Sequence, residues 1–290
     1  MPLSDTQSVL SVCVITYNHE HSIARALESI LSQETNFKFE IVVFDDASSD
    51  GTCDVIAEIC KRNPHRINLV KREVNVGAGT NWIELLNYPN SKYIAYLEGD
   101  DYWTDSHKLQ CQFDCMEADV SISLCFHDVL LHNMTSNLDL PFPSVSIKDK
   151  LFTVKDIILR SWFIPSGSIF FRAALVKAIP RDCVSVPNGD FILLYLASVS
   201  GDILRIPKVM GVYNYLALGS MSSNLGSGLA SRLQKLRNIK VTSKYLYHRA
   251  LPLARVFLVV RLAKINLLLV HCLIKLSLDR AVVKSNFWLD

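Results

Sequence analysis

The apolar residues in the first hundred positions fall into short β-branched runs, separated by stretches with helical spacing. Four of these runs predict strands: Val9–Ile15, Glu40–Phe44, Ile67–Val70 and Tyr93–Leu97. Between the runs, apolar residues recur every three or four positions, which predicts amphipathic helices. Strands and helices that alternate in this way form βαβ units with right-handed crossovers. The pattern therefore predicts an α/β fold with a mixed, mainly parallel central sheet flanked by helices.

The second half of the chain is less regular. Residues 134–150 are polar and contain prolines, and we expect a loop long enough to act as a lid or an acceptor loop. A last strand is predicted at Val209–Tyr215. Two helical stretches, 227–248 and 251–276, follow it near the end of the sequence. We therefore predict one nucleotide-binding domain over residues 1–220 and a C-terminal helical extension over residues 221–290.

Charge is spread unevenly, although the formal net charge is only +2. Residues 1–231 hold 18 Lys and Arg against 26 Asp and Glu, whereas residues 232–290 hold 12 Lys and Arg against 2 Asp. The longest uncharged run of this basic extension, Ile265–Ile274, is shorter than the roughly 20 residues that a membrane span needs. We therefore predict an amphipathic helix lying on an anionic membrane surface. The alternative is a helical hairpin packed on the body of the protein or on a second subunit of a homodimer.

The first residues and the cysteines indicate where in the cell the protein is expected. We recognise no signal peptide, because the apolar run at residues 9–15 is short and leads directly into a polar motif. The eight cysteines show no repeated metal-ligand spacing, so we expect free thiols in a reducing cytosol. The expected location is the cytoplasm, with peripheral attachment to the inner face of the plasma membrane. A nucleic-acid partner is not expected.

Polar residues follow each of the four predicted strands. The carboxyl ends of parallel strands meet at one edge of a sheet, where open α/β folds bind ligands. An acid at such a strand end accepts hydrogen bonds from a base or a ribose hydroxyl, so a nucleotide site is predicted here. The residues of interest in these strand-end clusters are Thr16, Tyr17, Asn18, Glu20, Asp45, Asp46, Asn75, Gly77, Glu98 and Asp100.

Three carboxylates stand within four positions at the end of the fourth strand: Glu98, Asp100 and Asp101. Acidic groups this close raise one another's pKa unless a cation lies among them. Hard divalent cations such as Mg²⁺ bind carboxylate oxygens together with the phosphate oxygens of a substrate. We predict that Asp100 holds such a metal opposite a diphosphate, with Asp101 as the alternative ligand.

Asp190 follows Asn188-Gly189 where a helix is predicted to begin. It has two interpretations. As an N-cap or first-turn acid it would stabilise the helix by about 1 kcal/mol. As a general base, it would present its carboxylate to a substrate at the exposed helix start.

Together these motifs resemble those of the family 2 glycosyltransferases, which have the GT-A fold. The resemblance covers about residues 8–220. It rests on four segments in this order: Ser11–Asn18, Glu40–Thr52, Asn75–Gly77 and Leu97–Asp101. It implies a transferase that moves a sugar from a nucleoside diphosphate of the UDP or dTDP type, and in this family the first strand end and the paired acids hold the nucleoside.

The resemblance also assigns the remaining roles. The Asp-x-Asp motif of the family stands here as Glu98-Gly99-Asp100 and would bind Mg²⁺ or Mn²⁺. Asp190 matches the acidic base, which takes a proton from the acceptor hydroxyl as that hydroxyl attacks with inversion. With the basic, apolar extension, a saccharide or lipid-linked acceptor in cell-surface polysaccharide synthesis is expected.

Two other functions are alternatives to the glycosyltransferase interpretation. A nucleotidyltransferase would need a glycine-rich, arginine-bearing loop after the first strand, where this chain has Thr16–Glu20. A non-catalytic sugar-nucleotide or membrane-binding protein with a GT-A fold would explain two departures from the family pattern. These are the glutamate at position 98 and the lack of a basic residue near Asn214.

Overall fold

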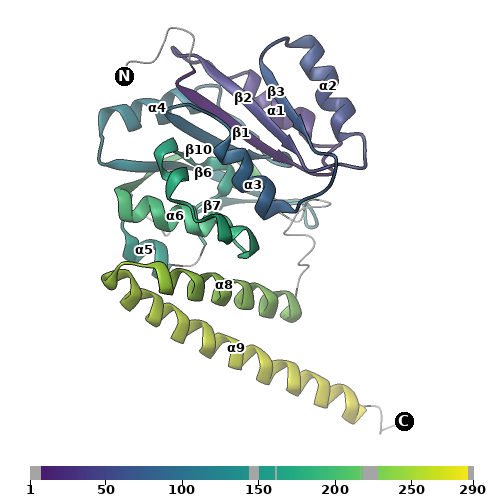
Figure 1. Cartoon of the computed structure of the whole chain (residues 1–290). Helices are drawn as coiled ribbons and strands as arrows, with labels where there is room; N and C mark the ends of the chain where they lie inside the picture. The colour runs from purple at the N-terminus through teal and green to yellow at the C-terminus, as the bar shows by residue number, and fades with distance from the viewer. Residues whose placement is uncertain (1–7, 144–149, 161, 216, 218–227, 287–290) are drawn as a thin grey trace.

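The computed structural model describes residues 8–143, 150–160, 162–215, 217 and 228–286, the last eleven by their backbone alone. Its centre is one ten-stranded sheet with the strand order β3-β2-β1-β4-β9-β6-β10-β5, to which β7 and β8 add at β6 and β10 (Figure 1). The strands are β1 (Leu10–Thr16), β2 (Phe39–Asp45), β3 (Ile67–Lys71), β4 (Tyr93–Glu98), β5 (Tyr102–Trp103), β6 (Ile122–Asn133), β7 (Leu138–Phe142), β8 (Leu151–Phe152), β9 (Phe170–Arg172) and β10 (Asp202–Tyr215).

Helices cover both faces of the sheet. One buried cluster packs α1, α2 and α4 against the first face, and a second packs α3, α5 and α6 against the other. The helices are α1 (Ile23–Leu31), α2 (Thr52–Arg62), α3 (Ala78–Asn87), α4 (Lys108–Ala118), α5 (Val154–Leu159), α6 (Gly189–Ser200), α8 (Leu229–Arg249) and α9 (Pro252–Asn286), with 3-10 turns at η1 (Ser166–Ser168), η2 (Ala173–Ala178) and η3 (Arg181–Ser185). The predicted α/β class is confirmed.

The sheet is parallel in its first half and mixed in its second. The strands β3, β2, β1 and β4 are all parallel. Strands β2, β1 and β4 are mostly buried apolar runs covered from both faces, whereas β3, at the edge of the sheet, is only partly buried. Strand β9 then lies antiparallel between β4 and β6, and β10 runs parallel to β6. The short β5 pairs antiparallel with β10, so the turn that joins β4 to β5 lies against the end of β10.

Two sequence-based boundaries were wrong. The strand predicted at Val209–Tyr215 begins at Asp202, and register shifts around Pro207 explain why the apolar pattern breaks there. The loop expected over 134–150 contains β7, which forms a hairpin with β6; residues 144–149 lie outside the described part. Its residues are mostly exposed and include Pro141, so they lack the alternation by which a strand is recognised.

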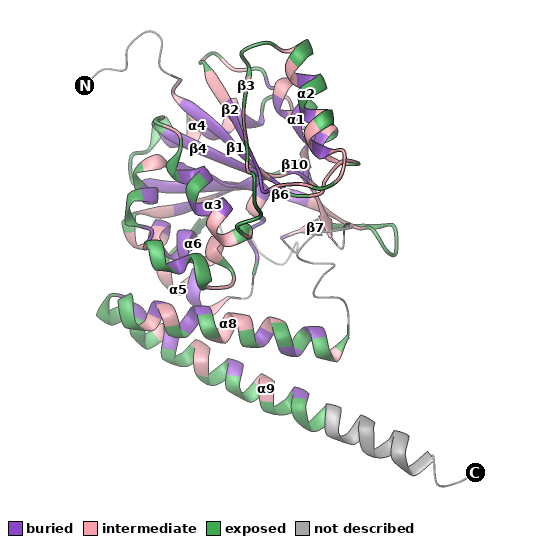
Figure 2. Ribbon diagram, turned by 45° about the vertical axis from the view of Figure 1, so that its right-hand side comes forward, coloured by how far each residue is buried: buried purple, intermediate pink, exposed green. Residues whose placement is uncertain are grey.

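The helices α8 and α9 form an antiparallel pair that packs on the body beside α5 and α6 (Figures 1 and 2). Four buried residues join them to the larger core cluster: Leu246, Ala250, Ala254 and Leu258. A separate small cluster around Leu233 and Ile265 holds the two helices together farther along. The predicted domain boundary, at residues 220 and 221, lies outside the described residues and stays a prediction.

Candidate active site

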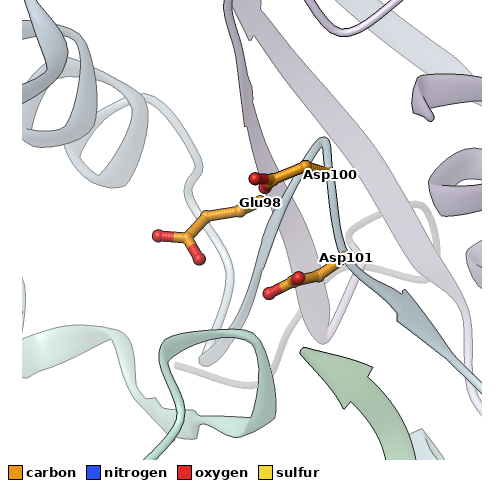
Figure 3. A group of neighbouring side chains, drawn as sticks. All are labelled: Glu98, Asp100 and Asp101. Atoms are coloured by element: carbon orange, nitrogen blue, oxygen red, sulfur yellow. The ribbon is translucent and has the colours of Figure 1, made fainter. Parts of the chain in front are cut away.

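The three carboxylates of the predicted metal site are close together in space. Glu98 ends β4, and Asp100 and Asp101 form the turn into β5 (Figure 3). One oxygen from each of the three carboxylates lies within 4.8 Å of the others. Asp101 is only 3% exposed, whereas Glu98 and Asp100 are partly exposed. The turn therefore gathers three acidic oxygens at the carboxyl edge of the sheet.

Segments distant in sequence hold this turn. The hydroxyl of Ser166 donates to Glu98 Oε2 at 2.9 Å. From β10, the backbone N–H of Asn214 donates to Asp101 Oδ1 at 2.8 Å, and its side-chain amide donates to the carbonyl of Asp100. The carboxylates are thus fixed by η1 and by the last strand of the sheet rather than by their own loop.

Burial and mutual repulsion perturb all three acids. Burial and the charge of Asp100 raise the pKa of Glu98 to about 8, with a smaller contribution from Asp190. Burial, followed by the charges of Asp100 and Glu98, raises the pKa of Asp101 well above its ordinary value. Burial also raises the pKa of Asp100, although nearby His19 opposes the shift. The three carboxylates repel one another, and a cation bound among them would reduce this repulsion.

Gly99 permits the close approach of this turn to the end of β1. A Cβ at position 99 would lie 2.7 Å from His19 Nδ1 and 2.8 Å from Thr16 Oγ1, so no larger residue fits without rearrangement. The backbone N–H of Gly99 donates to the carbonyl of Ile15 at 2.9 Å. Thr16 and His19 are themselves in contact, at 3.2 Å. The glycine of the Glu98-Gly99-Asp100 motif therefore joins the metal turn to the predicted nucleotide loop.

That loop follows β1 and packs against the start of α2. Asn18 takes a left-handed conformation with φ 54°, and its Oδ1 accepts from the backbone N–H of Ser49 at 2.8 Å. Glu20 Oε2 accepts from the backbone N–H of Gly51 at 2.7 Å. Tyr17, which comes directly before Asn18, is 41% exposed. Asn18 and Glu20 hold the loop, while the ring of Tyr17 is available to a ligand.

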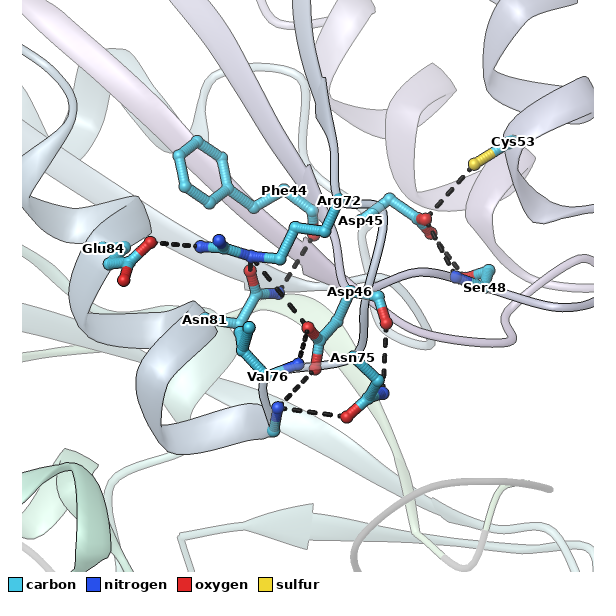
Figure 4. A network of polar contacts seen from close by, with 11 residues as sticks. Phe44, Asp45, Asp46, Ser48, Cys53, Arg72, Asn75, Val76, Asn81 and Glu84 are labelled. Atoms are coloured by element: carbon cyan, nitrogen blue, oxygen red, sulfur yellow. Dashed lines mark hydrogen bonds and ion pairs between the residues drawn. The ribbon is translucent and has the colours of Figure 1, made fainter.

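The paired acids after β2 are buried and engaged with protein groups (Figure 4). Asp45 is 0% exposed; it accepts hydrogen bonds from the N–H and hydroxyl of Ser48 and from the thiol of Cys53. Asp46 accepts from the backbone N–H groups of Val76 and Gly77 at 2.9 and 3.0 Å. Each acid therefore fixes a loop at this edge of the sheet.

The loop after β3 is held around Asp46. Asn75 donates from its side chain to the carbonyl of Asp46 at 3.0 Å, and Gly77 has the positive φ of 86° that favours glycine. Arg72 Nε lies 4.0 Å from Asp46 Oδ1 and donates to Asn81 Oδ1 at 2.7 Å. Its guanidinium also pairs with Glu84 (Figure 4). An arginine thus joins the loop to α3.

Asp190 lies in the first turn of α6, and its Oδ1 accepts a hydrogen bond from the backbone N–H of Phe191 at 2.9 Å. Asn188 is the N-cap, so the N-cap interpretation of Asp190 was wrong, whereas its place in the first turn is confirmed. Its charge contributes to the raised pKa values of Glu98 and Tyr96, so it lies within electrostatic range of both. Burial raises the pKa of Asp190 itself. The fold therefore brings Asp190 within electrostatic range of Glu98 from a distant part of the chain.

The sequence of this chain matches a known family. Residues 11–138 match the profile described as Glycosyl transferase family 2. This region of the chain belongs to the family 2 glycosyltransferases. As such, it transfers a sugar from a nucleotide sugar.

Relatives of this glycosyltransferase are bacterial. An uncharacterized protein of Mycobacterium tuberculosis is 29% identical over 240 residues, which are 79% of this chain and 68% of that protein. An Escherichia coli protein named UDP-Glc:alpha-D-GlcNAc-diphosphoundecaprenol beta-1,3-glucosyltransferase is 34% identical over 108 residues, 37% of this chain and 41% of its own.

Solved structures share the fold of the glycosyltransferase. The mannosyltransferase of Pyrobaculum calidifontis in complex with GDP-Man and Mn²⁺ superposes with a TM-score of 0.64 at 16% identity, covering 98% of this chain and 81% of that one. Residues 1–349 of TarS from S. aureus, in complex with UDP-GlcNAc, give a TM-score of 0.59 at 21% identity, covering 81% and 66%. The GT-A-like fold expected from the sequence is confirmed.

The C-terminal helices of the glycosyltransferase contact the segment that carries Asp190. The hydroxyl of Thr242 on α8 donates to the carbonyl of Pro187, just before α6. From α9, the Arg261 guanidinium stacks 4.5 Å from the centre of the Phe191 ring and donates to the carbonyl of Ile158 in α5. Burial lowers the pKa of Arg261 to about 10. The extension therefore helps to position the helix start that bears the candidate base.

Sequence reasoning missed four residues that position the site: His19, Arg72, Ser166 and Asn214. His19 lies within a motif that was recognised but carries no family role of its own. Ser166 and Asn214 are separated from their acidic partners by 68 and 114 positions, so no local pattern indicates the contact. A polar residue at the end of the last predicted strand was the available signal for Asn214.

Proposed function

We propose that this enzyme transfers the sugar of a UDP- or dTDP-sugar, with inversion, to a hydroxyl of a saccharide or lipid-linked acceptor in cell-surface polysaccharide synthesis. The observation that carries the proposal is the group of Glu98, Asp100 and Asp101 at the carboxyl edge of the sheet, and the charge of Asp190 acts on its first member. Asp190, the proposed base, would then act next to the three carboxylates, the proposed site of the diphosphate. The donor and acceptor printed in the name of the E. coli relative, and the UDP-GlcNAc held by TarS, support this substrate class.

The acidic group suits a divalent metal of the Mg²⁺ or Mn²⁺ type. Its donors are three carboxylates, which these hard cations prefer, and their raised pKa values reflect burial and the mutual repulsion that a cation would offset. Asp100 and Asp101 would hold the ion, with Glu98 beside them. When bound, the metal would neutralise the charge of the departing diphosphate. The Mn²⁺ of the P. calidifontis complex is consistent with this assignment.

The chain's own groups then supply orientation and proton transfer. Asp190 would accept the proton of the acceptor hydroxyl, and its burial raises its pKa and so its strength as a base. A hydroxyl activated on the side of the sugar opposite the diphosphate attacks from that side, which inverts the anomeric centre. We propose that Thr16, Tyr17 and Asn18 contact the nucleoside. Buried Asp45 and Asp46 would act mainly by holding the loops around it.

The donor class can be tested directly. The protein is incubated with UDP-, dTDP- and GDP-sugars with Mn²⁺, and release of the nucleoside diphosphate is followed. We expect turnover of a uridine or thymidine donor that stops when the metal is chelated. Turnover of GDP-sugars alone would overturn the donor assignment, and release that is unaffected by chelator would overturn the metal.

We further propose that the extension binds an anionic membrane surface and makes the enzyme peripheral to the plasma membrane. By length and composition alone, Pro252–Lys275 of α9 is apolar enough to cross a membrane. However, Arg261 ties this helix to α5, and α8 packs along it, which favours a helix lying against the bilayer (Figure 2). The outward apolar residues are Leu253, Val256, Val259, Val260, Leu267, Val270, Leu273 and Ile274.

Replacing Leu267, Val270 and Leu273 together by glutamine is expected to lower binding to phosphatidylglycerol vesicles at least about tenfold, since each burial contributes on the order of 1 kcal/mol or more. All three side chains are exposed, so the fold should be unaffected. Cosedimentation with the vesicles measures the effect. Val120→Gln, at an exposed site in the body, is the control. Equal sedimentation of the triple variant and wild type would contradict the proposal.

A further inference from the structure

A partly exposed aromatic cluster lies near the acidic group and has no role in the proposed donor chemistry. The Trp162 ring centre is 4.6 Å from that of Phe142 and 5.5 Å from that of Tyr213. The three rings come from β7, from the segment before η1 and from β10. Trp162 is 45% exposed. Tryptophan is usually well covered, and an exposed one within an aromatic cluster marks a binding surface.

The cluster is joined to the active site through β10. Tyr213 lines a small hollow together with Asp101 and Gly167. The next residue, Asn214, donates hydrogen bonds to Asp101 and to the carbonyl of Asp100. Tyr213 of the cluster therefore lies close to Asp101, one of the proposed metal ligands.

The strand order gives this surface a place relative to the donor. The candidate nucleoside residues follow β1, β2 and β3, on one side of the acidic turn after β4. The aromatic cluster is carried by β10 and by β7, on the other side of that turn. A nucleotide sugar whose diphosphate meets Asp100 would leave the aromatic side for the second substrate.

We propose that Trp162, Phe142 and Tyr213 form a platform that binds a pyranose ring of the acceptor, a subsite that rests on the proposed function. One face of a pyranose is lined by C–H groups, which pack on the face of an aromatic ring, while its hydroxyls remain free to react. The occupant is therefore a sugar of the acceptor, seated so that a hydroxyl can reach Asp190 and the donor.

The fourth aromatic residue of this region does not form part of the platform. The Tyr215 hydroxyl accepts a hydrogen bond from Lys235 Nζ at 3.2 Å, and the same ammonium lies 5.5 Å from the centre of the Tyr215 ring. Its contact with α8 explains this ring as a structural anchor. Trp162, by contrast, has nearly half of its surface free for a ligand.

Fluorine NMR of protein labelled with 5-fluorotryptophan tests the platform. The Trp162 resonance is assigned by its loss in Trp162→Phe, and methyl pyranosides of glucose, galactose, mannose and N-acetylglucosamine are titrated in the presence of UDP and Mn²⁺. At least one should shift the Trp162 resonance saturably and leave those of buried Trp82 and Trp103 in place. No shift from any pyranoside would overturn the proposal.

Kinetics with the pyranoside that binds supply a second readout. Trp162→Ala should raise the acceptor KM about tenfold, with the donor KM changed by less than about twofold. Tyr88→Ala is the control, because Tyr88 is 50% exposed but sits beside Asn68 at the opposite edge of the sheet. An unchanged acceptor KM in Trp162→Ala would overturn the subsite. The UDP-induced rise in Tm on the same sample reports the donor site separately, so failure of the proposed function is distinguishable.

Discussion

Replacing Asp100 by alanine is expected to lower sugar transfer at least about a thousandfold while making the metal-free protein more stable. In the absence of a cation, Asp100 is a partly exposed member of a repelling group and raises the pKa values of Glu98 and Asp101. Removing its charge should stabilise the folded state by about 1 kcal/mol, which corresponds to about one pKa unit. Transfer rates and Tm values in chelator report the two effects.

The same variant should no longer respond to the metal. Wild-type protein is expected to gain Tm with Mn²⁺ and UDP together, because a ligand that binds only the folded state stabilises it. Asp100→Ala should show no such gain. The matched control is Asp139→Ala, which removes an exposed acid from β7. A variant that keeps the metal-dependent rise in Tm would place the ion elsewhere, with Asp101 the next ligand to test.

Much of the fold and of the site was predictable because the signals are local. The parallel strands β1, β2 and β4 are apolar runs covered on both faces, and polar residues at the ends of the parallel strands come together for topological reasons. Asp100 and Asp101 could therefore be placed at the binding edge from the sequence around them.

The rest depends on contacts that no local pattern contains. Strand β5 has only two residues, yet its pairing with β10 delivers Asn214 to the acidic turn. Arg261 contacts Phe191 only because α9 folds back toward α6, and a count of charged residues contains no information about this. The count of charged residues led to the prediction of a membrane-bound extension. Part of the extension, from Leu246 to Leu258, also contributes buried residues to the main core cluster. Truncating the whole extension would therefore disturb the active site as well as any membrane binding.

Asp190→Asn is expected to lower kcat by about two to four orders of magnitude with little change in donor affinity. The substitution keeps the shape of the side chain and an Oδ1 that can accept from the backbone N–H of Phe191 at 2.9 Å. What it removes is the ability to take a proton. Single-turnover transfer, with donor affinity measured by the UDP-induced rise in Tm, separates the two quantities.

The control for this variant is Asp54→Asn, because Asp54 is also an acid in the first turn of a helix, that of α2. If Asp190 served only the helix dipole, both substitutions would cost at most about 1 kcal/mol of stability and both variants would remain active. A base predicts a different outcome, in which Asp190→Asn folds and binds donor but transfers slowly, while Asp54→Asn matches the wild type. Full turnover by Asp190→Asn would remove the residue from the reaction and leave the acceptor hydroxyl without a base.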